Sequence, residues 1–135
     1  TGWIDEVDEG YNYTIGSSEL ASRQLAWLKQ HGLDLQSRVY NLLSRKPKVA
    51  ASHRLQELRE HKDKRTLCRL AYQTWRIDFL RDDEAEEIEL CYFFSGYDQD
   101  TKDGKKPSKW ADVPLHVDFE SCFLNEITSQ ITWGQ

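Results

Sequence analysis

Hydrophobic positions change their spacing along this chain, from a helical period in the first third to a two-residue period in the middle. Apolar side chains recur at 21, 25 and 28 and again at 35, 39, 42 and 43, and each set forms one stripe on a helix. Ser17 and Ser18 offer an N-cap to the first helix, which we expect to end near Gly32. The second helix should begin near residue 34 and stop before Pro47, so a short connection predicts a helix hairpin.

The middle of the chain alternates apolar and polar positions, as half-buried strands do. Residues 55–61, 66–72 and 87–97 follow this pattern, and the aromatic stretch 11–15 can form a short strand before the helices. In residues 74–81 the apolar positions slip to odd numbers. Because a one-residue slip turns every side chain over, we expect a bulge or break near Gln73. For the tail, the pattern favours a helix around residues 119–129 and leaves a strand open.

This order of elements predicts an α+β fold. An N-terminal strand and the helix hairpin should pack on one face of a mainly antiparallel sheet of about four strands, which leaves the other face free for function. With 135 residues the chain is long enough for one packed domain. We expect an acidic arm over residues 1–10, the domain over 11–110, and a C-terminal extension over 111–135 packed on that domain.

Charge is segregated along the sequence. The whole chain carries a net charge of −5. Residues 45–69 nevertheless hold nine basic and three acidic side chains, whereas residues 78–100 hold nine acids and a single arginine. A basic segment on a predicted sheet surface points to an anionic partner.

The cysteines give little sign of covalent or metal chemistry. Cys68, Cys91 and Cys122 are odd in number and widely spaced, without a Cys-x-x-Cys pair or histidines at zinc-like spacing. We therefore expect no metal site, no cofactor and a reducing, cytoplasmic location. No apolar run approaches the roughly 20 residues that cross a bilayer, so we expect no membrane partner.

Two stretches resemble a known family. "LQELREHKDKRTLCRLAYQTW" followed by "IELCYFFSGYDQDTKDGKKPSKW" is similar to the RelE/ParE superfamily of bacterial toxins, and closest to its HigB and phage-encoded branch. In that branch a Leu-x-Glu-Leu-Arg strand, an Arg-hydrophobic-x-Tyr strand and an apolar strand before a Lys-rich loop recur in order. The resemblance covers residues 11–110 and would make them a RelE-like toxin domain.

The resemblance implies the toxin of a type II toxin–antitoxin pair, silenced by a cognate antitoxin. Such toxins are metal-independent endoribonucleases that inhibit translation by cutting mRNA, commonly on the ribosome, through attack of a ribose 2′-OH on the adjacent phosphodiester. ParE-type members inhibit gyrase instead. The acidic net charge departs from the usual basic character of RNA-directed members. The alternative is a non-catalytic module of the same fold, of the kind phages encode, that binds and regulates a partner protein.

The resemblance also assigns roles to particular residues. Arg69 matches the strand arginine that faces the scissile phosphate, and Arg59 matches the arginine of the neighbouring strand. Tyr97 falls where some members place an aromatic hydroxyl or a histidine. His61 is the local side chain whose unperturbed pKa lies near neutrality, and Glu57 and Glu60 are the alternatives for proton transfer.

Four lysines complete the predicted RNA-binding surface. Lys105 and Lys106 occupy the position of the family's basic loop, and the basic turn before the second sheet strand adds Lys62 and Lys64.

Overall fold

The computed structural model describes residues 13–45, 55–60, 63–107 and 111–134. Its elements in chain order are β1 (Thr14–Ser17), α2 (Glu19–Gln30), α3 (Leu35–Arg45), β2 (Leu55–Glu60), β3 (Thr66–Tyr72), β4 (Trp75–Asp82), β5 (Glu87–Ser95), α4 (Gln99–Lys102) and α5 (Val113–Gly134). The fold is α+β, as the sequence predicts. The tail forms a helix considerably longer than the expected 119–129.

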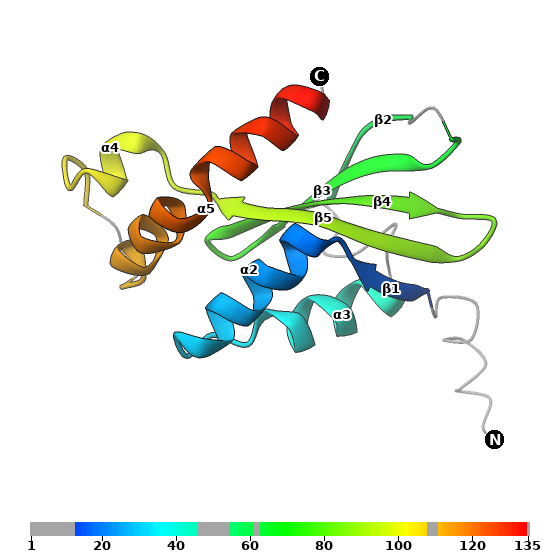
Figure 1. The fold of residues 1–135 in the computed structure, drawn as a ribbon, viewed down its shortest axis with the longest axis horizontal. Coiled ribbons are helices and arrows are strands. Elements are labelled where there is room, and N and C mark those ends of the chain that lie inside the picture. Colours follow the sequence, from blue (N-terminus) through cyan, green and yellow to red (C-terminus); the bar gives the residue numbers. More distant parts are fainter. Residues whose placement is uncertain (1–12, 46–54, 61–62, 108–110, 135) are drawn as a thin grey trace.

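The strands form one sheet in the order β1-β5-β4-β3-β2. β1 pairs with β5 in parallel, and every other neighbouring pair is antiparallel. The sheet has five strands rather than about four, because the break expected near Gln73 is a complete turn that starts a new strand. Gln73 has a φ of 53°, the left-handed conformation that such a tight turn requires. Figure 1 shows α2 and α3 together on one side of the sheet.

The two sides of the sheet differ in burial. The helix face, on which the helices pack, consists of fully buried side chains: Cys68, Leu70, Ile77, Phe79, Leu90 and Phe93. The open face carries the residues that alternate with these, and most are only half-buried: Leu67, Arg69, Ala71, Arg76 and Phe94. Because alternation separates the two sets, chemistry that needs solvent access belongs to the open face.

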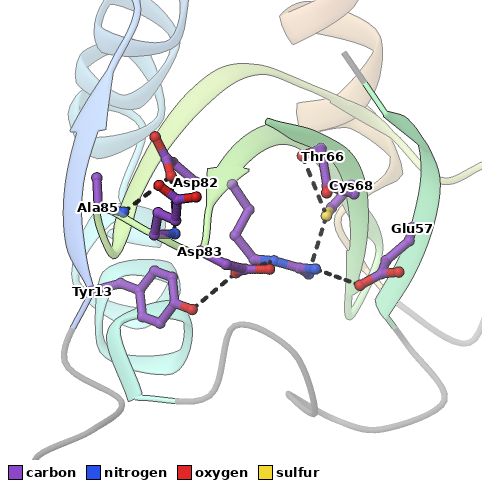
Figure 2. Close-up of polar contacts among 9 residues, drawn as sticks. Tyr13, Glu57, Thr66, Cys68, Asp82, Asp83 and Ala85 are labelled. Atoms are coloured by element: carbon purple, nitrogen blue, oxygen red, sulfur yellow. Dashed lines mark hydrogen bonds and ion pairs between the residues drawn. The ribbon is translucent and has the colours of Figure 1, made fainter. Parts of the chain in front are cut away.

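A buried arginine joins the far end of β4 to β2 on the helix face. Figure 2 labels the residues around it, among them Glu57, Cys68 and Asp83. Arg81 is only 3% exposed and donates hydrogen bonds to Glu57, to Asp83 at 2.9 Å, and to the sulfur of Cys68 at 3.4 Å. The Tyr13 hydroxyl donates to the same Asp83 oxygen at 2.9 Å. Burial raises the pKa of Cys68 to about 11, so this cysteine is a protonated thiol at neutral pH. The cluster is structural, because its members satisfy one another.

The edge of β5 poses a hydrogen-bonding problem, because β1 pairs only with the residues up to Leu90. The Ser18 hydroxyl accepts from the backbone N–H of Ala21 as the N-cap of α2, and it donates to the carbonyl of Cys91 at 2.7 Å. One turn later, the buried Gln24 accepts from the backbone N–H of Phe93 at 2.7 Å and donates to its carbonyl at 3.0 Å. The first helix therefore completes the strand pairing where β1 stops.

We predict that Gln24→Leu lowers the free energy of unfolding by about 2–4 kcal/mol, because it leaves two buried backbone groups of Phe93 without partners. Urea denaturation followed by circular dichroism measures the loss. Gln30→Leu is the matched control on the exposed side of the same helix and should change stability by less than about 0.5 kcal/mol. Equal effects of the two substitutions would contradict this account of the sheet edge.

Candidate functional site

The open face gathers arginines from three neighbouring strands. Arg69 on β3 lies opposite Asp78 on β4, and Arg76 on β4 lies opposite Ala71. On β2 the register shifts between Glu57 and Arg59, so that Arg59 lies opposite Leu67. Without that bulge Arg59 would point to the same side as Glu57, the helix face. The irregularity therefore places Arg59 on the face that carries Arg69.

Arg69 is held by a buried carboxylate. Its Nε donates to Asp78 at 2.7 Å and its Nη2 donates to the second carboxylate oxygen at 2.9 Å. The buried Tyr92 hydroxyl also donates to Asp78, at 2.5 Å. Asp78 is 1% exposed whereas Arg69 is 34% exposed. The guanidinium lies over the ring of Phe94, with 4.9 Å from Cζ to the ring centroid.

This geometry fixes the position of Arg69 but neutralises it locally. Hydrogen bonding to Asp78 raises the pKa of Arg69, and burial raises that of the Tyr92 phenol, so both stay protonated at any physiological pH. A guanidinium has five N–H donors. Asp78 takes two of them, and the Tyr92 hydroxyl also lies within hydrogen-bonding reach of the guanidinium. The pair can therefore still donate to an anion, although with less Coulombic attraction than a free arginine.

Arg76 stabilises the turn between β3 and β4 by hydrogen bonds to its backbone carbonyls. Its Nη1 donates to the carbonyls of Gln73 at 3.1 Å and Trp75 at 2.9 Å. The guanidinium lies against Gly96, where a Cβ would come within 2.6 Å of its carbon. Any larger residue at 96 would displace Arg76. The sequence-based reasoning missed both Arg76 and Asp78, although their alternation with apolar residues 75, 77 and 79 was a signal that they share a face.

The predicted site residues are not all brought together. Tyr97 donates its hydroxyl to Asp112 at 2.6 Å, beside α5, and so contacts the C-terminal helix instead of Arg69. Glu57 and Glu60 lie opposite Cys68 and Thr66, on the helix face. His61 lies outside the described residues.

The predicted lysines lie in turns and loops. Lys64 and Lys105 are exposed, and Lys64 adopts a left-handed conformation with φ 72°. The Lys106 ammonium bonds to Asp98 at 3.0 Å. Lys62 lies outside the described residues. The described lysines thus supply exposed charge but no preformed pocket.

Within the ranges that the structure describes, no helix is long and apolar enough to cross a membrane. In the same ranges, no three His, Cys, Asp or Glu side chains lie close enough together to hold a metal ion.

Comparison with known proteins supports the fold. No family model matches the sequence, and no curated protein matches it. Among solved structures, the chain is similar to one from the archaeal RelE–RelB complex of Pyrococcus horikoshii OT3, with a TM-score of 0.52 and 14% identity over 63% of this chain and 96% of that one. A chain of the toxin–antitoxin complex RelBE2 from Mycobacterium tuberculosis gives a TM-score of 0.44 at 17% identity, over 65% and 95%. The chain thus has a RelE-like fold.

We predict an asymmetric response when the Arg69–Asp78 pair is broken. Arg69→Ala strands a fully buried carboxylate and should lower the free energy of unfolding by about 3–5 kcal/mol. Asp78→Ala leaves an arginine that can reach water, so its cost should be about 1–2 kcal/mol. The double variant should be more stable than Arg69→Ala alone. Urea denaturation of the three variants checks this order, and equal losses would contradict it.

Proposed function

We propose that this chain is the toxin of a toxin–antitoxin pair, a metal-independent endoribonuclease that cleaves mRNA and is silenced by a cognate antitoxin protein. The observation that carries the proposal is Arg69 itself, which two hydrogen bonds to Asp78 hold on the open face while its side chain stays 34% exposed and has N–H donors beyond those two. A RelE-like fold supports it, because the similar solved chain comes from a RelE–RelB complex. We also propose that, within the RelE/ParE superfamily, this chain is most similar to the HigB and phage-encoded branch.

In the proposed reaction a ribose 2′-OH loses its proton to a base and attacks the adjacent phosphodiester. The P–O5′ bond breaks, which leaves a 2′,3′-cyclic phosphate and a 5′-oxygen that takes up a proton. Arg69 donates to the non-bridging oxygens, where charge develops, and Asp78 and Tyr92 keep its guanidinium in place. Arg59 approaches the RNA strand from β2 on the same face. His61 is the proposed proton acceptor, and the lysines at 62, 64, 105 and 106 guide the RNA backbone. Tyr97, held by Asp112, would contribute only if RNA drew it away.

We predict that the double variant Arg69→Gln/Asp78→Asn loses activity while it still folds, because two amides replace the ion pair without stranding a charge. Induced expression in a bacterial host should arrest growth with wild type, and mapping of mRNA 5′ ends should reveal new cuts. The double variant should cut at least 100-fold more slowly, the typical cost of one lost transition-state donor.

The matched control is Arg23→Gln/Glu126→Gln, which neutralises an exposed ion pair between α2 and α5. This control should cut RNA as wild type does. If wild type cuts mRNA and the Arg69→Gln/Asp78→Asn variant cuts equally well, the assigned site is wrong.

The second candidate is a non-catalytic module of the same fold that binds a partner protein. The neutralisation of Arg69 by Asp78 favours it, because an RNA-cleaving site works best with unshielded cations, and the chain as a whole is acidic. Wild-type protein that leaves growth and mRNA intact, yet co-purifies in a fixed ratio with the product of a neighbouring gene, would establish this candidate over the enzyme.

A further inference from the structure

A buried polar cluster fixes the first turn of α5 to the end of the sheet. His116 on α5 has no exposed surface, and its ring stacks on that of Trp75 with 3.8 Å between centroids. Its Nδ1 lies 2.6 Å from the hydroxyl of Ser95, at the end of β5. Its Nε2 lies 3.0 Å from the hydroxyl of Thr74 and 3.2 Å from Asp112, the residue before the helix.

The hydrogen-bond directions select a neutral imidazole. The Thr74 hydroxyl donates to Asp112 at 2.5 Å, so its oxygen is free to accept from His116 Nε2–H. Ser95 Oγ accepts from the backbone N–H of Tyr97 at 3.1 Å, so its hydrogen is free to donate to His116 Nδ1. In this arrangement every donor meets an acceptor.

A proton added to Nδ1 disturbs this arrangement. Nδ1 would then donate to Ser95, whose hydroxyl hydrogen would lose its acceptor among the described residues. It would also place a charge at a site without solvent contact. Asp112 nearby offsets part of this cost.

The charged groups around His116 act in both directions. Burial lowers the pKa of His116 below its ordinary value, and this effect outweighs the opposing attraction of Asp112 and Glu120. Lys102 on α4 lowers the pKa further, although its ammonium is bound to Glu120 at 2.6 and 2.7 Å. Tyr97 contributes a hydroxyl to Asp112 and an edge-on ring to His116.

The remainder of α5 is attached by apolar contacts, by the largely buried ion pair between Glu120 and Lys102 of α4, and by an exposed ion pair. Phe119 meets the rings of Trp27 and Trp75, and Phe123 meets Trp27. Farther along, an exposed ion pair joins Glu126 to Arg23. Among the polar attachments described for this helix, the His116 cluster is the one built on a side chain with no exposed surface, and we expect it to be the most sensitive to protonation.

We propose that α5 is a pH-gated latch, which is docked on the sheet while His116 is neutral and is released by local unfolding when His116 takes up a proton. Release uncovers the face of Trp75 on which His116 stacks and the side of Trp27 that Phe119 and Phe123 contact. Release also withdraws Phe119, Phe123 and Ile127 from the single core cluster, while the buried side chains that α2, α3 and the sheet contribute to that cluster stay packed on one another.

Proton linkage determines the direction in which pH changes the docking of α5. Because the released helix exposes His116 with an ordinary pKa near 6.5, the released state binds more protons than the docked state below that pH. Docking is thus at full strength above about pH 6.5 and weakens as the pH falls toward the lowered pKa of the docked state.

The test is amide hydrogen exchange of the full chain at pH 7.5 and 5.5, corrected for the intrinsic dependence of exchange on pH. Protection of α5 amides should fall between the two values by up to about tenfold, the limit for one proton-linked opening. Protection of β4 and β5 amides should not change. Equal α5 protection at both values, or a parallel loss across the sheet, would overturn the proposal.

His116→Gln removes the titration and should abolish the dependence of α5 protection on pH. His31→Gln is the matched control, because His31 stacks on Trp27 with the same 3.8 Å separation but is exposed. This control should respond as wild type does, and a pH response retained by His116→Gln would contradict the latch. Should His116→Gln fail to fold, the wild-type ring titration by NMR decides: His116 must titrate below pH 6.5.

Discussion

The hydrogen-bonding edge of β5 is the constraint on which the rest of this fold depends. β1 covers that edge only as far as Leu90, and beyond it the backbone polar groups must find other partners away from water. Ser18 and Gln24 supply them from the start of α2. The position of the first helix against the sheet is thereby set by directional bonds as well as by apolar packing, and the remaining helices pack around it.

With the helices on one side, the opposite face of the sheet can carry polar side chains. Its central feature is an arginine that shares its charge with a buried aspartate. Such a pair contributes little net stability, because removing two charges from water costs about what their attraction returns. What the pair does provide is position: Asp78, Tyr92 and Phe94 together hold the guanidinium in one orientation, while the Arg69 side chain remains 34% exposed. A guanidinium held in this way needs no reorganisation to meet an anion, although the aspartate reduces its Coulombic attraction.

The C-terminal helix α5, like the open face, depends on a small number of buried polar contacts. Most of its buried side chains are aromatic or aliphatic, and one histidine sits among them with every ring nitrogen occupied. A fully satisfied buried network of this kind fixes a unique docking geometry, and it does so only in one protonation state. The same His116 cluster therefore sets the docking position of α5 and makes that docking sensitive to pH.

Local sequence determined the elements whose signals are short-range: the two helices of the hairpin, the alternating strands and the acidic turn between β4 and β5. It also indicated that Arg69 lies on a strand face opposite to Cys68 and Leu70, because alternation needs no knowledge of the partner strand. Tertiary structure alone decided the rest. Gln24 meets Phe93 across 69 positions and His116 meets Thr74 across 42, and no periodicity specifies such partners. The face of Arg59 depends on a bulge, and the fifth strand on a turn at Gln73, since one residue more or less reverses every side chain that follows.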